Sequence, residues 1–361
     1  MPASSARSSG NGPESVCLLR LSAIGDCCHA LPVLRTLQAA WPETRFTWII
    51  GQTEHRLMEG VEGVEFITFD KRHPRASRAA IRRQLQDRRF AVLLHMHASM
   101  RANLLSRCVR AERRIGFDRA RARDGQWLFS NERIAAGERQ HVMDGFFGFA
   151  EHLGIHRREL RWDIPLGAAE RAFAAAQAPG TGPLVVISPC SSQRLRNYRN
   201  WRVEHYAALI AQLQGKYDAQ VVLSGADTAI ENHYGKALEA AAARPLANLI
   251  GRTSLKQLLA LIERAALLIC PDSGPAHMAT AVRTPVVGLY ASSNRWRTGP
   301  YLSQELVVDR YPEAVQREFG VPVSQLRWGQ RVRDPAAMEL ITPAAVMAAV
   351  DRVLGGPDGR P

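Results

Sequence analysis

The sequence predicts two doubly wound α/β domains with a cleft between them. Short apolar runs alternate with helical patterns along the chain, which is typical of a parallel sheet covered by helices on both faces. The alternation occurs in two series, and a Pro/Gly-rich passage at 176–183 separates them. A length of 361 residues is enough for two such domains, each with its own core.

The first series predicts a domain over residues 15–175. It follows a polar segment, residues 1–14, that we expect to be a disordered N-terminal tail. Apolar residues at helical spacing predict helices at 31–41 and 79–85. The predicted strands are 15–21, 45–51, 64–69, 91–97 and 113–117.

The second series follows the predicted linker at 176–183 and predicts a domain over residues 184–335. Its expected strands are 183–189, 219–226, 247–251, 266–274 and 284–293. Its expected helices are 201–217, 229–243, 254–265 and 275–282. Residues 336–361 are expected to form a C-terminal helix and then a tail, with Pro343 in the first turn of the helix.

Composition excludes several classes of protein. A hydrophobic content of 46% and a charged content of 22% are values of globular proteins. No apolar run approaches the ~20 residues that cross a bilayer, and the N-terminal segment lacks the apolar core of an export signal. We therefore expect the protein in the cytoplasm. The six cysteines match neither a zinc site nor a disulfide framework, so we expect reduced thiols in the core.

The positive charge is concentrated in one segment. Residues 71–123 contain 16 Lys and Arg but only three acidic residues, and this excess equals the net charge of +13 of the whole chain. We expect the segment to face something anionic, such as phosphates, acidic sugars or an acidic membrane surface. A solubilising arginine-rich surface is an equally good interpretation of the charge alone.

Three strand-to-helix turns contain residues suited to a functional site, because ligands of open α/β sheets bind at the carboxyl ends of the strands. The first turn is Ser22–Asp26. Gly25 allows a tight or left-handed turn, and Asp26 lies at or near a helix start. Asp26 alone is best explained as a helix cap. No G-x-G-x-x-G pattern is present, so a dinucleotide fingerprint is excluded.

The second turn combines small hydroxyl residues with arginines. It follows the strand at 183–189 and precedes the helix that begins near Trp201. Free N–H groups and guanidinium groups at this place favour the binding of a diphosphate over a solvated surface loop. The residues concerned are Ser188, Ser191, Ser192, Arg194, Arg196 and Arg199.

The third turn, within ICPDSGPAHMATAV at 269–282, gives the strongest signal. Ser273, Gly274 and the helix-terminal N–H groups form a cradle for anionic oxygens. Asp272 is expected to order the loop or to contact a hydroxyl group. His277 lies on the first helical turn, where it can point toward a ligand.

Two further features are expected at the carboxyl ends of the strands. His95 and His97 alternate on a predicted strand, and one or both are expected to end that strand near an acceptor. Two histidines do not make a zinc site, which needs three or four ligands, so no metal is assigned. The polar loop at 290–301 follows a strand and is placed to line the cleft.

Three segments of the chain resemble the signature regions of glycosyltransferase family 9, which contains the lipopolysaccharide heptosyltransferases. They are LLRLSAIGDCCHALPVLRTLQAAWP, ISPCSSQRLRNYRNWRVEHYAAL and PDSGPAHMATAVRTPVVGLYASSN, and the resemblance covers about residues 16–300. It implies a GT-B fold, in which two Rossmann-like domains face a central cleft, with the acceptor on the first and the nucleotide-sugar on the second. It also implies that the C-terminal helix packs back on the first domain.

The resemblance also implies roles for individual residues. Asp26 matches the aspartate that deprotonates the acceptor hydroxyl in an inverting reaction without metal. Arg199 matches the basic residue, often lysine, that contacts the donor phosphate, although arginine is a planar fork rather than a point charge. Glu231 is a loose counterpart of the acidic residue that contacts the ribose. The predicted donor-binding residues are Ser188, Ser191, Ser192, Arg196, Arg199, Glu231, Asp272, Ser273, Gly274 and His277. The predicted acceptor-binding residues are Gly25, His29, His97 and Arg101.

These observations predict a glycosyltransferase that moves a heptose from ADP-heptose to a lipopolysaccharide-core or related saccharide, in peripheral contact with the cytoplasmic face of the inner membrane. The nucleotide-sugar is a substrate, so no cofactor is expected. One alternative keeps the fold but uses another nucleotide-sugar for a different cell-surface glycan. Another is a nucleic-acid-binding protein acting through residues 71–123, although that stretch contains only two aromatic residues, Phe90 and Phe117.

Overall fold

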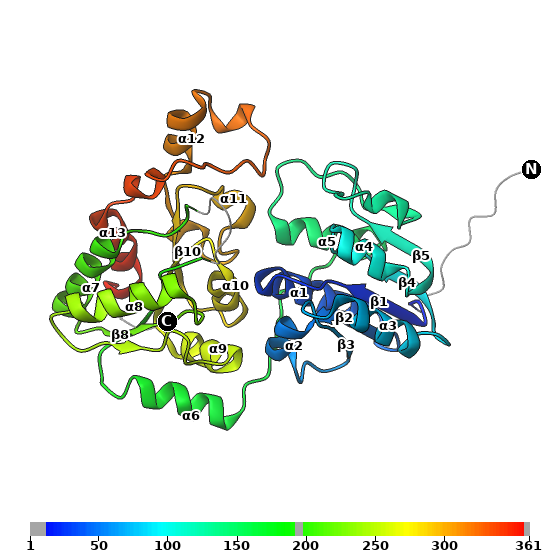
Figure 1. Cartoon of the computed structure of the whole chain (residues 1–361), viewed down its shortest axis with the longest axis horizontal. Coiled ribbons are helices and arrows are strands. Elements are labelled where there is room, and N and C mark those ends of the chain that lie inside the picture. Colours follow the sequence, from blue (N-terminus) through cyan, green and yellow to red (C-terminus); the bar gives the residue numbers. More distant parts are fainter. Residues whose placement is uncertain (1–11, 192–197, 357–361) are drawn as a thin grey trace, which may run out of the picture. The chain divides into compact units, whose positions relative to one another are not determined.

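The computed structural model describes residues 12–191 and 198–356. These residues form two compact units (Figure 1). Unit 1 consists of the residues up to Glu138 together with Met143–Ile164, and unit 2 consists of Arg139–Val142 and the residues from Pro165 onward. The predicted N-terminal tail falls mostly on residues 1–11, which lie outside the described part of the chain.

Unit 1 is built on a six-stranded parallel sheet of order β3-β2-β1-β4-β5-β6. Its strands are β1 (Ser15–Leu19), β2 (Arg45–Gly51), β3 (Glu65–Phe69), β4 (Arg89–Leu94), β5 (Arg110–Gly116) and β6 (Glu132–Arg133). In the central strand, Val16 pairs with Phe46 on one side and with Val92 on the other. β1 is buried along its whole length, which explains why its sequence is a continuous apolar run.

Helices lie between the strands of unit 1, and a last helix, α5, follows β6 (Figure 1). They are α1 (Ile24–Ala40), α2 (Gln52–Met58), α3 (Pro74–Gln84), α4 (Met100–Ser106), the 3₁₀ helix η1 (Gln126–Leu128) and α5 (Val142–His152). The strand order is that of a doubly wound sheet, which changes direction between β1 and β4. Segments that follow these two strands are therefore placed at the position where such sheets bind ligands.

Unit 2 repeats this topology, with the strand order β12-β11-β10-β7-β8-β9 and parallel pairing throughout. Its strands are β7 (Leu184–Ile187), β8 (Gln220–Leu223), β9 (Ala247–Asn248), β10 (Leu267–Pro271), β11 (Val286–Tyr290) and β12 (Val308–Asp309). The change of direction lies between β7 and β10. The two predicted donor-binding turns follow these two strands.

The helices of unit 2 flank this second sheet. The α-helices are α6 (Ala168–Gln177), α7 (Val203–Tyr217), α8 (Ala229–Ala241), α9 (Leu255–Arg264), α10 (Gly274–Ala281), α11 (Arg295–Thr298), α12 (Tyr311–Phe319) and α13 (Pro343–Leu354). Short 3₁₀ helices are η2 (Gln304–Leu306), η3 (Val323–Gln325) and η4 (Ala337–Leu340). The two predicted doubly wound domains are thus confirmed.

The predicted linker at 176–183 is wrong, because that passage is packed within unit 2. The side chain of Gln220, on β8, accepts a hydrogen bond from the backbone of Gly180 and donates to the carbonyls of Gly180 and Gly182. Helix α6, which the sequence assigned to the first domain, packs on α9 and forms the ion pair Arg171–Glu263. The units instead divide between Ile164 and Pro165.

The C-terminal helix also belongs to unit 2, contrary to the prediction that it packs on the first domain. α13 packs on α7 and β11, and its residues Val346 and Val350 are fully buried in the core of unit 2. The indole N–H of Trp201 donates to the carbonyl of Ile341, just before the helix. The Tyr217 hydroxyl donates to Asp351 near its end. The apolar face of α13 is therefore used within unit 2.

The six cysteines are free thiols. Five are buried, as predicted, and Cys108 is half-buried. Burial raises the pKa of Cys17 and Cys270 to about 12, so both are protonated and chemically inert near neutral pH.

Candidate active site

The turn between β1 and α1 contains the predicted catalytic carboxylate. Asp26 is the third residue of α1. Its Oδ2 accepts a hydrogen bond from the backbone N–H of Ala23, 3.2 Å away, which satisfies one of the N–H groups at the helix start. The side chain is 30% exposed. The same carboxylate therefore supports the helix and faces solvent.

Arg20 holds this carboxylate, and it is absent from the residues predicted above. Its guanidinium forms an ion pair with Asp26 Oδ2 and donates a hydrogen bond of 2.6 Å to the carbonyl of Met96. It also lies over the ring of Phe146, 5.1 Å from the centroid. The signal in the sequence is an arginine within an otherwise apolar run, six positions before the aspartate.

His97 lies beside this pair, in the segment that follows β4. Its Nδ1 accepts a hydrogen bond of 3.1 Å from the backbone N–H of Leu21. Burial, together with the guanidinium of Arg20, lowers the pKa of His97 to about 3. The ring is therefore neutral near pH 7, and because Nδ1 is an acceptor, its proton is on Nε2. His97 can act there as a hydrogen-bond donor.

His95 does not lie beside the Arg20–Asp26 pair. Its ring is completely buried, and burial lowers its pKa to about 3. β4 ends at Leu94, so the two histidines lie beyond the strand and do not alternate along it as predicted. Of the two, His97 is the one that reaches the Asp26 site.

A second carboxylate, Glu54, lies near the same turn and was not predicted. Its residue is 7% exposed, and burial raises its pKa, an effect that the nearby charge of Asp26 increases and that of Arg20 opposes. The side chain packs against Gly51, where a Cβ would lie 2.3 Å from Glu54 Oε2. Any side chain at Gly51 would therefore displace this carboxylate.

The other predicted acceptor-binding residues differ in accessibility. Gly25 has helical backbone in the first turn of α1, so the left-handed turn that a glycine allows is not used here. His29 lies one turn beyond Asp26 and is 2% exposed, which removes it from direct contact with a ligand in this structure. Arg101 is exposed in the first turn of α4 and lowers the pKa of His97 slightly through its charge.

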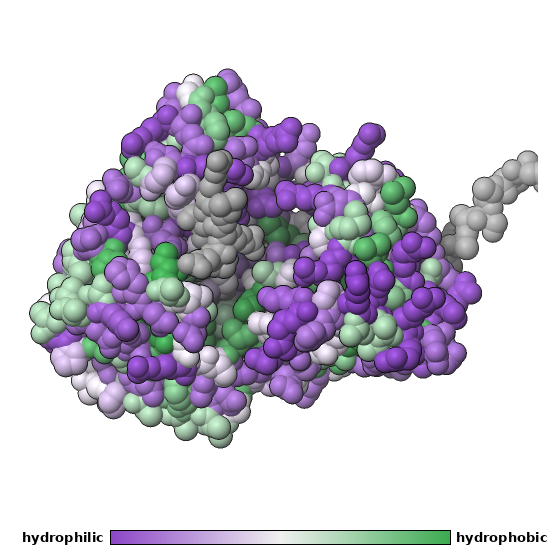
Figure 2. Space-filling view, viewed as in Figure 1, coloured by the Kyte–Doolittle hydropathy of each residue, from purple (hydrophilic) through white to green (hydrophobic). Residues whose placement is uncertain are grey.

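The basic segment 71–123 places an exposed cationic face on α3. In this helix Ile81 is buried. The exposed arginines of α3 are Arg75, Arg78, Arg82 and Arg83, and none of them forms an ion pair with a described residue. Some arginines elsewhere in the segment form ion pairs, as in Arg88–Glu65 and Arg113–Glu132. The surface over α3 is hydrophilic in Figure 2.

In unit 2, the turn between β10 and α10 contains the residues of the predicted anion cradle. Ser273 is the N-cap of α10, Gly274 is the first helical residue, and Pro275 follows in the first turn. The Ser273 side chain does not cap the helix, and its buried Oγ has no oxygen or nitrogen partner in the described chain. His277 is 8% exposed in the same turn. The N–H groups at this helix start are oriented for an anion.

Arg199, predicted to contact the donor phosphate, is bonded to Asp272 in this structure. Its guanidinium is buried and donates to both the backbone carbonyl of Asp272, at 2.7 Å, and the carboxylate, at 3.2 Å. It therefore clamps the loop that precedes α10. The carboxylate of Asp272 is buried as well, and Arg331, which was not predicted, lies 4.0 Å from it. Asp272 orders the loop, as expected.

The hydroxyl groups of the second turn are engaged within the protein. Ser188 Oγ lies 2.5 Å from Ser224 Oγ, and both residues are buried. Ser191 donates from its backbone N–H and from its hydroxyl to Asn200 Oδ1. The remaining residues predicted in this turn lie outside the described residues; they are Ser192, Arg194 and Arg196.

Glu231 lies in the first turn of α8, after β8. Its Oε1 accepts a hydrogen bond from the backbone N–H of Ala226 at 2.9 Å, and its Oε2 accepts from the hydroxyl of Thr228 at 2.6 Å. Thr228 in turn caps α8 through the backbone N–H of Glu231. Acidic residues after the second strand of a Rossmann fold contact ribose hydroxyls. Glu231 has that place in the topology but is 8% exposed and committed to helix capping.

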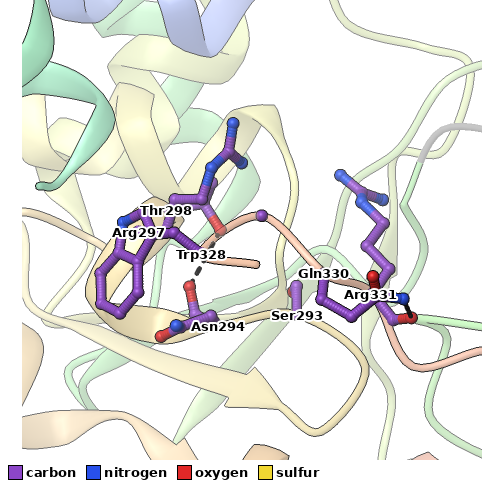
Figure 3. Close-up of a pocket in the computed structure, with 8 residues that line it drawn as sticks. Ser293, Asn294, Arg297, Thr298, Trp328, Gln330 and Arg331 are labelled. Atoms are coloured by element: carbon purple, nitrogen blue, oxygen red, sulfur yellow. Dashed lines mark hydrogen bonds between the residues drawn. The ribbon is translucent and has the colours of Figure 1, made fainter. Parts of the chain in front are cut away.

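The polar loop after β11 forms a pocket with the segment at 328–331, as Figure 3 shows. Its lining residues are Ser293, Asn294, Arg297, Thr298, Trp328, Gly329, Gln330 and Arg331. The loop was predicted to line a ligand site, whereas the contribution of 328–331 was not, because this segment is distant in the sequence.

No group of three His, Cys, Asp or Glu side chains within 12–191 and 198–356 has the arrangement of a metal site. In the same part of the chain, every helix is too short or too polar to cross a membrane.

Comparison with known proteins identifies relatives over nearly the whole chain. The model of glycosyltransferase family 9 (heptosyltransferase) matches residues 78–325. The lipopolysaccharide core heptosyltransferase OpsX of Haemophilus influenzae is 37% identical over 341 residues, which are 94% of this chain and 97% of the relative. None of these matches supports the alternative of a nucleic-acid-binding protein.

Solved structures agree on the fold. The family 9 glycosyltransferase of Veillonella parvula is 18% identical, with a TM-score of 0.78 over 94% of this chain and 97% of that chain. The E. coli heptosyltransferase WaaC with ADP is 19% identical, with a TM-score of 0.69 over 94% of this chain and 99% of that chain. The predicted GT-B fold class is confirmed. The family match and the extent of identity together establish that this chain belongs to glycosyltransferase family 9.

Proposed function

We propose that this protein transfers a heptose from ADP-heptose to a saccharide of the lipopolysaccharide core, with inversion and without a metal ion. The name of the Haemophilus influenzae relative, a lipopolysaccharide core heptosyltransferase, supports the reaction and the acceptor class. The E. coli heptosyltransferase WaaC has been solved with ADP and with ADP-2-deoxy-2-fluoro heptose, which supports the donor. Another nucleotide-sugar remains the alternative donor.

The observation that carries the proposed mechanism is the partly exposed carboxylate of Asp26, held in place by Arg20 and by the N–H of Ala23. Asp26 takes the proton of the acceptor hydroxyl as the hydroxyl oxygen attacks the anomeric carbon. The bond from that carbon to the diphosphate breaks, and ADP leaves with the electron pair. Attack on the face opposite the leaving group inverts the anomeric configuration.

Unit 2 supplies the groups that stabilise the leaving diphosphate. The N–H groups at the start of α10 and the hydroxyl of Ser273 face the developing negative charge. The Arg199–Asp272 clamp keeps the preceding loop in one conformation. Fixed dipoles need no reorganisation as charge develops, so they stabilise the transition state more than the bound donor.

Unit 1 supplies the groups that recognise the acceptor. Besides Arg20, which is paired with Asp26, the Nε2–H of His97 and the exposed guanidinium of Arg101 are donors that can bind an acceptor. The arginines of α3 form an exposed cationic face that suits phosphates or acidic sugars of a glycolipid. With a glycolipid acceptor, the protein would work in peripheral contact with the cytoplasmic face of the inner membrane.

The Asp26→Asn variant tests the mechanism. Asparagine has nearly the same shape and can still accept the hydrogen bond from Ala23, so the fold and donor binding are expected to persist. Transfer is expected to fall ~10²–10⁴-fold, the usual contribution of a general base. The exposed Asp87→Asn provides a matched control. Retained transfer, or loss of ADP binding together with transfer, would show that Asp26 is a structural cap.

A thermal-shift screen tests the donor. ADP-, GDP-, UDP- and dTDP-sugars are compared, because a bound ligand raises stability as RT ln(1 + [L]/Kd). ADP-heptose is expected to give the largest shift in the wild type and an unchanged shift in Asp26→Asn. A larger shift with another nucleotide-sugar would favour the alternative donor.

A further inference from the structure

Unit 1 exposes a group of large apolar side chains that the roles above do not use. Among the described residues, five large hydrophobic side chains are exposed, and four of them lie on α4 and η1. On α4, Met100 is 49% exposed and Leu104 is 37% exposed. On η1, Trp127 is 48% exposed and Leu128 is 76% exposed. Exposed apolar residues are ordinary when they are scattered, whereas a group of them marks an interaction surface. We call these four residues the apolar patch.

Hydrogen bonds hold α4 and η1 side by side. At one end, the carboxylate of Asp124, which precedes η1, accepts a hydrogen bond of 2.9 Å from the backbone N–H of Met100. At the other end, the guanidinium of Arg114 donates to the carbonyl of Ser106, the last residue of α4, and to that of Phe129, which follows η1. The apolar residues of the two segments therefore share one part of the surface of unit 1, which is in place before any partner binds.

Burial is reversed between neighbouring residues of η1. Gly125, just before η1, has a φ of 70°, which glycine adopts without strain. The polar Gln126 that follows is fully buried, and its side-chain amide donates a hydrogen bond of 2.8 Å to the carbonyl of His95. Trp127 and Leu128 come next and remain exposed. The fold thus anchors the amide inside and leaves two large apolar side chains outside, which indicates that they contact a partner.

Exposed arginines accompany the apolar patch. Those on α4 and in the segment before η1 are Arg101, Arg107, Arg119 and Arg123, and none of them forms an ion pair with a described residue. Arg101 and Arg107 each lie three residues from Leu104, which makes them its neighbours on the helix surface. The exposed carboxylate among them, Asp124, is bonded to the N–H of Met100. The surroundings of the patch are therefore cationic.

The cationic helix α3 extends this surface. Ile81 of α3 and Leu105 of α4 belong to the same core cluster, so the two helices cover the same face of the sheet. The thiol of Cys108, just after α4, donates a weak hydrogen bond of 3.9 Å to the carbonyl of Arg78 on α3. In Figure 2, hydrophobic side chains are visible on unit 1 above the hydrophilic surface of α3. An apolar area and an arginine-rich area thus adjoin on one side of unit 1.

The apolar patch lies near the candidate acceptor site. α4 follows β4 and η1 follows β5, so both segments come after the carboxyl ends of their strands, as the Asp26 turn does. Met100 is three residues from His97, whose ring is bonded to the N–H of Leu21 beside that turn. A lipid-linked acceptor held at the patch therefore has its saccharide at the edge of the sheet where the carboxylate of Asp26 lies.

We propose that the apolar patch inserts into the headgroup region of an anionic lipid bilayer, while the exposed arginines of α3 and α4 contact the lipid phosphates. Tryptophan and aliphatic side chains beside arginines are typical of segments that lie in a membrane interface. The apolar groups enter the acyl boundary, and the cations are attracted by the negative surface. A second copy of the chain is a poorer partner, because a symmetric contact would bring like charges together. The choice of a bilayer rests also on the proposed function, whose acceptor is a glycolipid.

Binding to vesicles without turnover tests the patch. The full-length protein is mixed with vesicles of phosphatidylethanolamine and phosphatidylglycerol, or of phosphatidylcholine alone, and bound protein is separated by flotation. Trp127→Ser and Leu128→Ser remove side chains that are exposed, so both variants are expected to fold, which thermal unfolding verifies. Trp296→Ser is the matched control for vesicle binding, because Trp296 is an exposed tryptophan of unit 2. Arg107→Gln is compared with Arg252→Gln, an exposed arginine of unit 2.

Brominated acyl chains give a second readout, because bromine quenches the fluorescence of tryptophans that enter the bilayer. We expect the quenching seen in the wild type to be lost largely in Trp127→Phe and to persist in Trp296→Phe. The opposite pattern would show that another surface contacts the lipid.

We expect the wild type to bind anionic vesicles more tightly than neutral ones. Trp127→Ser and Leu128→Ser should each weaken this binding ~10-fold, and Arg107→Gln roughly 5-fold, whereas both control variants bind as the wild type does. A wild type that does not bind anionic vesicles, or patch variants that bind them as Trp296→Ser does, would overturn the inference. A dimer in solution that dissociates in Leu128→Ser would also overturn it, because a second copy would then cover the patch.

Transfer assays separate this inference from the proposed function. In Leu128→Ser, transfer to an acceptor embedded in vesicles should fall together with vesicle binding, whereas transfer to a soluble acceptor without its lipid should be retained. Equal loss with both acceptors would show that the patch serves the site rather than the membrane, and would overturn the inference. A protein that binds anionic vesicles through the patch but does not transfer heptose would refute only the proposed function.

Discussion

Replacing Arg199 by methionine is expected to destabilise unit 2 because it leaves the carboxylate of Asp272 buried without its main partner. The two side chains are 9% and 7% exposed, and Arg199 also holds the backbone carbonyl of Asp272. Removing one member of a buried pair costs about 3–5 kcal/mol. Arg331, 4.0 Å from the carboxylate, compensates in part, so we expect the low end of that range.

A double-mutant cycle measures this contribution. Arg199→Met, Asp272→Asn and the double variant are compared by calorimetry, which can separate the unfolding of the two units. At roughly 2–4 °C per kcal/mol for a domain of this size, a loss of about 3 kcal/mol lowers the Tm of unit 2 by roughly 6–12 °C. The double variant is expected to recover roughly 1–3 kcal/mol of that loss, since no charge remains buried without a partner.

If Arg199→Met changes the Tm of unit 2 by less than ~2 °C while ADP binding is lost, Arg199 binds the donor phosphate directly, as the resemblance implied. The clamp on the Asp272 loop would then be unimportant for stability. A double-mutant cycle with no coupling free energy between Arg199 and Asp272 would also show that the clamp does not stabilise unit 2.

Three further predictions concern other parts of the molecule. Arg20→Met is expected to lower kcat ~10–100-fold with little change in the donor KM, because the Asp26 carboxylate loses its orientation, and Arg20→Lys should recover part of the rate. The free energy of unfolding of unit 1 should fall as the pH is lowered from about 6.5 toward 3. The reason is that His95 and His97 stay neutral in the folded protein down to a pH of about 3 but are protonated in the unfolded chain. Urea titrations in which the stability of His95→Asn has the same pH dependence as that of the wild type would contradict this. Val350→Ala should lower the stability of unit 2 by about 2 kcal/mol and accelerate hydrogen exchange in Val203–Tyr217, whereas an effect on unit 1 alone would show that α13 packs elsewhere.

Much of the fold could be predicted because its signals are local. The apolar runs at 45–51 and 286–290 form strands, and the capped amphipathic pattern at 254–265 forms a helix, close to the predicted bounds. The strand-to-helix turns at Asp26 and Asp272 were also predicted, since each combines the end of an apolar run with residues typical of helix starts. In a parallel sheet this order along the chain already determines that each turn lies at the carboxyl edge of its own sheet.

The parts that could not be predicted depend on contacts between distant segments. The pattern of α13 predicts a helix with one apolar face, but not that the face packs on α7. The Pro/Gly passage at 176–183 has the composition of a linker, but Gln220 fixes it within unit 2. In the same way, Arg331 approaches Asp272 only in the folded chain.

The position of Asp26 shows why a role in stabilising the helix start and a role as catalytic base, which compete in the sequence, are compatible in the structure. As an N-cap residue, it would direct its oxygen toward the N–H groups of the helix it starts. At the third position, it instead contacts the N–H of Ala23 behind it and the guanidinium of Arg20, the residue that follows β1. These contacts fix the side chain while 30% of it stays accessible. A carboxylate that stabilises the helix start in this way is already oriented before an acceptor binds, which is the condition that efficient proton abstraction requires.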